Sequence, residues 1–321
     1  MKVLTLISRI IVSFTFIFSG FVKLVDPLGS SYKFQEYFGS DVLNMEFLIP
    51  YALPFSIFLI IVELMLGVML LLGYLPKFTV WSLFFMMLIF LFLTWYSAYY
   101  NKVTDCGCFG DAVKLSPWGT FYKNVVLMGF ILILLFTTKY IHRFMNLTFV
   151  KWTVFLSFFA LFYITYYVLV HLPIIDFRPY AIGKNIPDGM KPVGGELPLI
   201  HDFYLENSEG LNLTDEVLSE ENVMLIIVNN LDKSDKQGFS NIKKVTNKAI
   251  EKGYKVYALS ASLEDDFLFV KSDSDLNFEM LFCDETTLKT IIRANPGIVT
   301  LQKGTVTGKW NWIDADKVFD K

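Results

Sequence analysis

Apolar residues fill the first half of the chain in long runs, which stop near Leu172. Five runs approach the length of about 20 residues that a helix needs to cross a bilayer. They lie approximately at residues 4–22, 51–72, 78–99, 117–138 and 149–170. The first run is not expected to be a signal peptide, because Ser19-Gly20-Phe21-Val22-Lys23 lacks a small-x-small cleavage site and further runs follow. The pattern therefore predicts an all-α bundle of transmembrane helices.

Short apolar runs alternate with amphipathic stretches in the second half. Strands are predicted at residues 203–205, 223–228, 255–260, 279–283, 297–302 and 305–310. Helices are predicted at residues 240–252, 263–271 and 285–293, the last capped by Asp284. This alternation is typical of an α/β domain with a mixed sheet.

These patterns predict three parts. Residues 1–145 are expected to form a four-helix transmembrane core, and residues 146–195 a fifth transmembrane helix followed by an ordered linker. Residues 196–321 are expected to form the α/β domain, after a boundary rich in glycine and proline at residues 183–195. The prolines and aromatic residues of segment 171–180 suggest an ordered collar on the membrane surface.

Charge divides the chain in the same way. From Pro173 onward there are 17 Lys and Arg against 24 Asp and Glu, a net charge of −7. The preceding 172 residues hold 11 basic and 7 acidic residues, a net charge of +4. An acidic domain offers no electrostatic surface for nucleic acid. The lipid bilayer is the partner that composition indicates directly, since 54% of the residues are hydrophobic.

Basic residues in the short links indicate the orientation of the helices. They lie before or within the first run, in the second link and between the last two runs: Lys2, Arg9, Lys77, Lys139, Arg143 and Lys151. These three regions are expected to face the cytoplasm. The acidic domain and the loop after residue 100 then share the opposite compartment. We expect a multi-pass protein of the bacterial inner membrane, with a cytoplasmic N-terminus and a periplasmic C-terminal domain.

Two ionisable side chains, Arg9 and Glu63, interrupt the apolar runs. Charges at membrane depth are costly and mark pairing or functional sites. We counted the depth of each residue in the membrane from the end of its run. If neighbouring runs are antiparallel, the depths of Arg9 and Glu63 differ by one or two helical turns. The hypothesis is a structural ion pair between the first two spans. The alternative is a proton or quinone site.

The loop between the third and fourth runs holds two of the three cysteines, in the sequence Asp105-Cys106-Gly107-Cys108-Phe109-Gly110-Asp111. A disulfide between residues i and i+2 lies near the outer limit of tolerated geometry. Strained, exposed disulfides are the more oxidising and labile ones. Ser116-Pro117 is typical of a helix N-cap followed by proline at the first helical position. The positive end of that helix would favour a thiolate, whereas Asp105 and Asp111 would oppose it.

Three interpretations of the cysteine pair remain open. Cys106 and Cys108 form a redox-active pair, a passive structural disulfide, or part of a metal site. The metal interpretation lacks further ligands, because the three histidines lie far away in sequence. No metal is therefore expected.

The motif Asp105-Cys106-Gly107-Cys108-Phe109-Gly110, followed by Pro117 and Asn124, resembles the MauE family. MauE proteins are membrane proteins linked to disulfide formation during methylamine dehydrogenase maturation. The first half also resembles the related DoxX family. That resemblance rests on Arg9, Ser19-Gly20, Lys23, Asp26-Pro27, Gly29, Glu63 and Gly67.

The resemblance covers about residues 1–145. It implies a four-helix bundle of the kind that quinone-linked disulfide oxidoreductases use. We expect the redox pair to be surrounded by Gly107, Phe109, Asp105, Asp111 and Asn124. The fifth span and the appended domain depart from the short members of these families.

Asn295-Pro296-Gly297 with the following strand and Lys303-Gly304 hairpin resembles the thioredoxin fold around its cis-proline. Pro296 would then be a partner-binding or substrate-binding residue. The chain departs from thioredoxin after the central strand, where Asn229 to Ser234 contain no cysteine. Cys283 is expected to be a buried apolar residue, and the alternative is a thiol that exchanges with the loop.

Two functions follow from these observations. The first is a membrane thiol–disulfide oxidoreductase that uses Cys106 and Cys108, with the C-terminal domain as a docking module for a periplasmic thiol protein. A quinone is the open candidate for its electron acceptor. The second is a non-enzymatic membrane scaffold with a structural disulfide, whose domain binds a partner complex.

Overall fold

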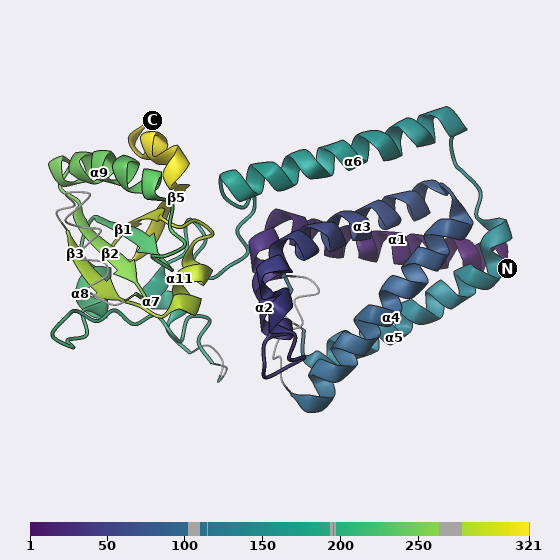
Figure 1. The fold of residues 1–321 in the computed structure, drawn as a ribbon, viewed down its shortest axis with the longest axis horizontal. Helices are drawn as coiled ribbons and strands as arrows, with labels where there is room; N and C mark the ends of the chain where they lie inside the picture. The colour runs from purple at the N-terminus through teal and green to yellow at the C-terminus, as the bar shows by residue number, and fades with distance from the viewer. Residues whose placement is uncertain (102–109, 114, 193–194, 196, 263–277, 321) are drawn as a thin grey trace. The chain divides into compact units, whose positions relative to one another are not determined.

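In the computed structural model the chain forms two compact units, Met1–Leu169 and Val170–Lys321 (Figure 1). The structure describes residues 1–101, 110–113, 115–192, 195, 197–262 and 278–320. Long apolar helices make up the first unit, and a mixed five-stranded sheet forms the centre of the second. The predicted succession of a helical membrane bundle and an α/β domain is confirmed.

Within the described residues, five helices are long and apolar enough to cross a membrane. They are α1 (Lys2–Val25), α3 (Ala52–Leu72), α4 (Pro76–Tyr100), α5 (Pro117–Thr137) and α6 (Leu147–Val170). Each overlaps one predicted span and differs from it by a few residues at the ends. A 3-10 turn, η2 (Thr138–Tyr140), extends α5.

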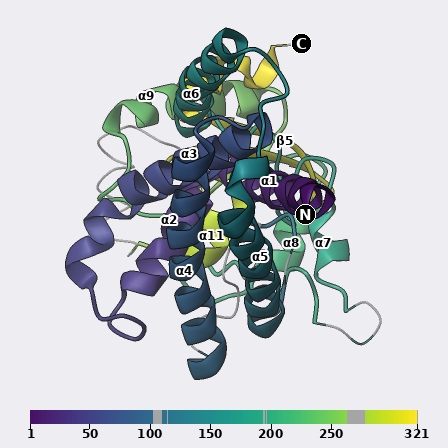
Figure 2. The same ribbon diagram turned by 90° about the vertical axis from the view of Figure 1, so that its right-hand side faces the viewer.

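Helices α1, α3, α4 and α5 share one apolar core. Helices α4 and α5 run side by side in both views of the molecule (Figures 1 and 2). Two glycines bring α1 and α3 close together. A Cβ at Gly20 would lie 2.6 Å from Leu64 Cγ, and a Cβ at Gly67 would lie 2.9 Å from Ile17 Cγ1. These contacts fix the register of the antiparallel pair.

Helix α6 lies at the edge of the bundle. Its buried residues are few, namely Val150, Thr165 and Val168, while most of its aromatic side chains are exposed. Leu161 and Ile164 pack against a small apolar cluster of α1 and α3. This burial pattern is that of a lipid-facing helix added to a four-helix core.

The link after α1 contains a helix that the sequence analysis did not predict. Helix α2 (Pro27–Phe38) begins at Asp26, whose side chain accepts a hydrogen bond from the Gly29 amide at 3.0 Å. A 3-10 helix, η1 (Glu46–Tyr51), then leads into α3. The Asp-Pro pair is an N-cap followed by proline at the first helical position, a signal that could have predicted α2.

The described residues of the second unit form one sheet with the strand order β3-β2-β1-β4-β5 (Figure 1). The strands are β1 (Val223–Val228), β2 (Lys255–Ser260), β3 (Glu279–Phe282), β4 (Gly297–Gln302) and β5 (Thr305–Asn311). Strand β1 pairs parallel with β2 and antiparallel with β4. The prediction of a strand at residues 203–205 is wrong. This segment is irregular, and only Glu206 beside it forms isolated bridges, to Asn212 and Phe282.

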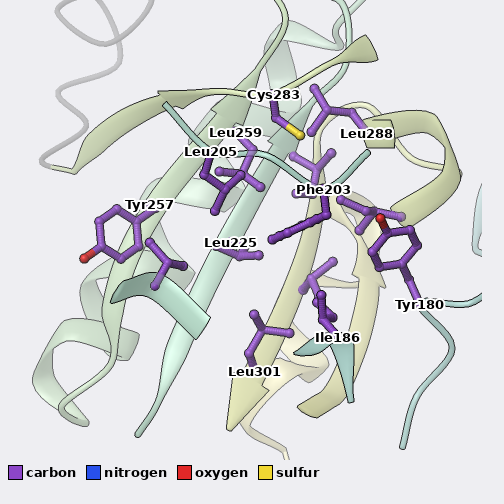
Figure 3. Packing of buried hydrophobic residues seen from close by; sticks show 14 of the residues in the cluster. Tyr180, Ile186, Phe203, Leu205, Leu225, Tyr257, Leu259, Cys283, Leu288 and Leu301 are labelled. Carbon is purple, nitrogen blue, oxygen red and sulfur yellow. The ribbon is translucent and has the colours of Figure 1, made fainter. Parts of the chain in front are cut away.

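Apolar residues cover both faces of this sheet. Alternate residues of β1 belong to two separate clusters, with Leu225 and Ile227 in one and Met224 and Ile226 in the other. The first cluster also holds Phe203 (Figure 3). A strand buried on both sides produces the continuous apolar run seen in the sequence.

Helices cover the two faces. They are α7 (Ile186–Gly189), α8 (Thr214–Ser219), α9 (Lys236–Glu251), α11 (Glu285–Ile291) and the 3-10 helix η3 (Trp312–Phe319). Helix α9 begins four residues earlier than predicted, because Asp235 caps it through a hydrogen bond from the Gln237 amide. Asp284 caps α11, as predicted. The helix predicted at residues 263–271 lies outside the described residues.

Candidate functional site

The cysteine loop joins α4 to α5, and its central part lies outside the described residues. This applies to Asp105, Cys106, Gly107, Cys108 and Phe109, so their predicted roles remain predictions. We call the end of the bundle where this loop joins the helices the loop end. There α1 and α4 finish and α3 and α5 begin.

The described flank of the loop rests on α1. Gly110 adopts φ +49°, and a Cβ at this position would lie 3.1 Å from Val22 Cγ1. A left-handed conformation with so little space favours glycine. Asp111 follows and is partly buried. The second flank is fixed by Ser116, whose side chain accepts a hydrogen bond from the Gly119 amide at 3.1 Å and caps α5 as predicted.

A buried ion pair lies beside this contact, one residue further along α1. Lys23 Nζ is 2.7 Å from Glu63 Oε2 on α3, and the two side chains are 9% and 2% exposed. Lys23 also donates a hydrogen bond to Ser19 Oγ at 3.1 Å. Its ammonium group lies 5.3 Å from the centre of the Phe90 ring on α4. An ion pair in a helical membrane bundle is costly unless both charges are well paired, and is a candidate functional site.

The predicted pairing of Arg9 with Glu63 is wrong. Arg9 donates hydrogen bonds to the carbonyl oxygens of Leu70 at 2.9 Å, Leu71 at 2.8 Å and His142 at 2.8 Å. Its guanidinium group also stacks over the Phe144 ring at 4.2 Å. Arg9 therefore caps the C-terminal end of α3, where backbone carbonyls lack partners within the helix and attract a cation.

The register of the helices explains this error. Gly20 faces Leu64 and Gly67 faces Ile17, so Glu63 lies level with residue 21 of α1. Arg9 is about twelve residues away from that level, or roughly 18 Å at 1.5 Å per residue. Lys23 is only two residues away. The first predicted run ends at residue 22 and so leaves Lys23 out. The i, i+4 spacing from Ser19 would have placed Lys23 on the same face of a longer helix as Ser19.

Asn124, predicted to support the redox pair, lies in the second turn of α5 and is buried. Its Nδ2 donates a hydrogen bond to Thr94 Oγ1 of α4 at 3.3 Å. Thr94 in turn donates to the Phe90 carbonyl oxygen at 2.7 Å. Asn124 therefore ties together the two helices that carry the cysteine loop, near the loop end of the bundle.

An open groove of about 450 Å³ lies between α1 and α5. Its walls are mostly apolar, with polar atoms from Thr15, Tyr122 and Lys123. The other lining residues are Ile11, Val126, Leu127 and Phe130. The volume lies within the range of pockets that bind small organic molecules.

The C-terminal domain contains no thiol where thioredoxin has its Cys-x-x-Cys. Asn230 follows β1, and its carbonyl oxygen accepts a hydrogen bond from Asn295 Nδ2 at 2.6 Å. The Asn295-Pro296 bond is cis, as predicted. Pro296 is buried, and Gly238 makes room for it, because a Cβ there would lie 2.9 Å from Pro296 Cγ. Its predicted partner-binding role remains a prediction.

Cys283 lies in the core of this domain beside Leu205, Leu259 and Leu288 (Figure 3). Its side chain is fully buried. Burial, followed by the negative charges of Asp284 and Asp202, raises the pKa of the Cys283 thiol to about 12. A buried thiol with so high a pKa is a poor nucleophile, which agrees with the prediction of a buried apolar residue.

A second buried lysine–carboxylate cluster, which the sequence analysis missed, fastens the segment after α6 to the sheet. Asp176 Oδ1 is 2.7 Å from Arg178 Nε, and Asp176 Oδ2 is 2.8 Å from Lys309 Nζ of β5. Lys309 also donates to the Ile291 carbonyl oxygen at 2.6 Å. Burial and the charges of Arg178 and Arg293 lower the pKa of Lys309 to about 8, although Asp176 opposes this. No sequence pattern connects residues 133 positions apart.

A family model agrees with the predicted resemblance of the helical part to MauE. Residues 1–137 match the family model of methylamine utilisation protein MauE. The thioredoxin domain of a thiol-disulfide oxidoreductase from Bacteroides vulgatus aligns with 14% identity and a TM-score of 0.30. The alignment covers 40% of this chain and 87% of that domain. No curated protein matches the sequence. The helical part is thus similar to MauE over residues 1–137, and the strand order and Pro296 give the C-terminal domain a thioredoxin-like fold.

Proposed function

We propose that this protein is a membrane thiol–disulfide oxidoreductase whose reactive groups are Cys106 and Cys108. The loop faces the periplasm of a bacterium in this proposal, and the C-terminal domain docks a thiol protein on the same side. The observation that carries the proposal is the anchoring of the loop through Gly110 on Val22, beside the buried Lys23–Glu63 pair.

The cysteine inventory supports this assignment. The chain contains three cysteines, and the third, Cys283, is buried with its pKa raised to about 12. Any thiol chemistry of the chain therefore depends on the loop pair. A MauE-like bundle with a thioredoxin-like domain fits a redox-associated membrane protein.

The surroundings of the loop favour thiol chemistry. Gly110, which follows the cysteine motif in the sequence, contacts Val22 of α1 at the loop end. A nearby ammonium group or helix N-terminus stabilises a thiolate. At the loop end, Lys23 supplies an ammonium group and α5 supplies a capped helix N-terminus.

The proposed reaction transfers two electrons from the client to the loop. A client thiolate attacks one sulfur of the Cys106–Cys108 disulfide, the S–S bond breaks, and the released loop thiolate takes up a proton. The second client thiolate attacks the mixed disulfide, which forms the client disulfide and leaves two reduced loop cysteines. A membrane quinone then accepts two electrons and two protons and restores the loop disulfide. The groove between α1 and α5 is the candidate quinone site.

Trapping of reaction intermediates tests this proposal. In cells that produce the full-length protein, Cys106→Ser and Cys108→Ser each leave one loop thiol. At least one variant is expected to accumulate mixed disulfides that disappear on reduction. Cys283→Ser is the matched control and is expected to trap nothing. The oxidoreductase proposal fails if both loop variants fold, trap nothing and leave client oxidation unchanged.

The second candidate function is a scaffold with a structural disulfide. The observation that favours it is that the thioredoxin-like domain has no Cys-x-x-Cys after β1, where Asn295 donates a hydrogen bond to the Asn230 carbonyl oxygen. If the protein is a scaffold, the double variant Cys106→Ser/Cys108→Ser is expected to bind its partner complex in pull-downs as the parent protein does. The oxidoreductase predicts recovery of the complex together with loss of client oxidation.

A further inference from the structure

The segment that follows α6 reverses the usual distribution of polar and apolar side chains. Asp176 and Arg178 are turned into the C-terminal domain, with side chains that are 16% and 3% exposed. The apolar residues around them are exposed instead: Ile174 at 59%, Ile175 at 42%, Phe177 at 41% and Ile182 at 61%. A water-exposed loop would be expected to show the opposite arrangement.

Ion pairs and backbone hydrogen bonds hold this segment in place. Asp176 bridges Arg178 and Lys309, and its Oδ1 also accepts a hydrogen bond from the Arg178 amide at 3.1 Å. Further along, the Gly183 amide donates to the Val306 carbonyl oxygen of β5 at 2.8 Å. Phe177 lies between Asp176 and Arg178, whose side chains are buried and form an ion pair. The exposure of the apolar side chains is therefore a property of a fixed backbone.

Chain connectivity keeps these residues close to a membrane surface. Ile174 follows Val170, the last residue of α6, by four positions, which limits the distance between their Cα atoms to about 14 Å. Exposed tyrosines occupy the last turns of α6, at Tyr163, Tyr166 and Tyr167. Tyrosines are enriched at the boundary between membrane and water, so they mark the level at which the helix leaves the hydrocarbon.

We propose that Ile174, Ile175 and Phe177 insert into the interfacial region of the phospholipid bilayer next to the end of α6. The burial of Asp176 and Arg178 removes their charges from this surface, and the side chains that remain have the chemistry of the headgroup–acyl boundary. A bilayer is the occupant that the structure favours, because the transmembrane helix delivers the segment to it. The exposed side chains are uncharged, so binding requires no anionic lipid.

Fluorescence quenching tests this proposal on the full-length protein in nanodiscs. Phe177→Trp places an indole in the segment, and the phospholipids carry bromine atoms on their acyl chains. The fluorescence of the introduced indole is obtained by subtracting the emission of the parent protein. In brominated nanodiscs this fluorescence is expected to be at most half of its value in nanodiscs without bromine. Zwitterionic and anionic lipids are expected to quench equally.

Leu211→Trp provides the matched control. Leu211 is 54% exposed and belongs to the turn that bridges through Glu206 to β3, whereas Gly183 pairs with β5. These are opposite edges of the sheet, about 19 Å apart at 4.8 Å per strand. The emission of the control indole is expected to be insensitive to bromine.

Two outcomes would overturn the proposal. One is that bromine does not quench the indole introduced by Phe177→Trp, while aqueous acrylamide quenches it as strongly as the indole introduced by Leu211→Trp. The other is that the emission from the Phe177→Trp variant changes only when a protein partner is added. If Phe177→Trp does not fold, Ile174→Trp provides the same measurement at the more exposed position. The redox state of the loop cysteines does not enter this test.

Discussion

In the described part of the chain, each compact unit buries a lysine beside a carboxylate, and the two sites differ in their surroundings. In the C-terminal domain, Lys309 and Asp176 lie 2.8 Å apart, within a cluster that includes Arg178 and the carbonyl oxygen of Ile291. In the helical bundle, Lys23 and Glu63 lie 2.7 Å apart, and the further contacts of Lys23 are a serine hydroxyl and an aromatic ring.

This difference indicates different roles. The Asp176 cluster joins three backbone segments and fixes the course of the chain after α6, which is a structural task. The Lys23–Glu63 pair joins two helices that Gly20 and Gly67 already bring together, so packing does not require it. Its position beside the anchor of the cysteine loop connects it to the proposed chemistry.

Removal of one charge from the bundle is expected to have the largest effect. Glu63→Leu leaves Lys23 buried without a carboxylate, which should destabilise the bundle by about 3–5 kcal/mol. Unfolding of the full-length protein in nanodiscs, followed by pulse proteolysis, measures this loss. Unchanged stability would show that Lys23 finds another partner.

The double variant Lys23→Leu/Glu63→Leu separates folding from function. Replacement of both charges by apolar residues should restore most of the stability. Client oxidation by this variant is nevertheless expected to be at least tenfold slower than in the parent protein. Full activity in a folded double variant would make this pair as structural as the Asp176 cluster.

Asp176→Asn tests the other side of the comparison. It leaves Arg178 and Lys309 buried without their shared carboxylate, and should cost the C-terminal domain about 3 kcal/mol. The rate of client oxidation per folded molecule is expected to stay within twofold of the parent value. A specific loss of oxidation without loss of stability would contradict the structural role.

The pH dependence of stability provides a smaller signal. The pKa of Lys309 is about 8 in the folded protein and lies near 10.4 in an unfolded chain. The unfolded state therefore binds more protons between these values, so stability should rise with pH in this window, by at most about 1.4 kcal/mol per unit. Urea unfolding of the C-terminal domain at pH 7.5 to 10 measures this rise. The rise should vanish in Lys309→Met.

Cys283→Ala is expected to have the smallest effect. It removes one sulfur atom from a closed core and should cost about 1 kcal/mol. Trapping of mixed disulfides by the loop variants should be unchanged in its presence. A loss of trapping would make Cys283 a participant in exchange, despite its burial and raised pKa.

The helices and strands that could be predicted from the sequence are those whose residue pattern is set by one physical requirement. Bilayer thickness sets the length of the apolar runs, which located the five long helices of the described residues. Burial on both faces makes β1 a continuous apolar run, and Lys303-Gly304 marks the turn between β4 and β5, where both residues have positive φ. Helix α2 was missed because it is short and weakly amphipathic.

Side-chain partners were harder to predict. Counting from the ends of the spans placed Arg9 near Glu63, whereas the contacts of Gly20 and Gly67 set a register that brings Lys23 there instead. The link between Asp176 and Lys309 depends on how the chain folds back on β5. Sequence spacing places Lys23 on the face of Ser19 but does not give the register of α1 against α3, and it carries no information on the link between Asp176 and Lys309.

The redox potential of the Cys106–Cys108 pair tests the central claim most directly. Full-length protein in nanodiscs is equilibrated with defined ratios of oxidised and reduced glutathione or dithiothreitol, and its loop thiols are counted by alkylation. An exchange site should titrate between about −120 and −230 mV, the range of disulfide-donating and glutaredoxin-type proteins. A potential below about −300 mV would mark a structural staple and contradict the proposed function.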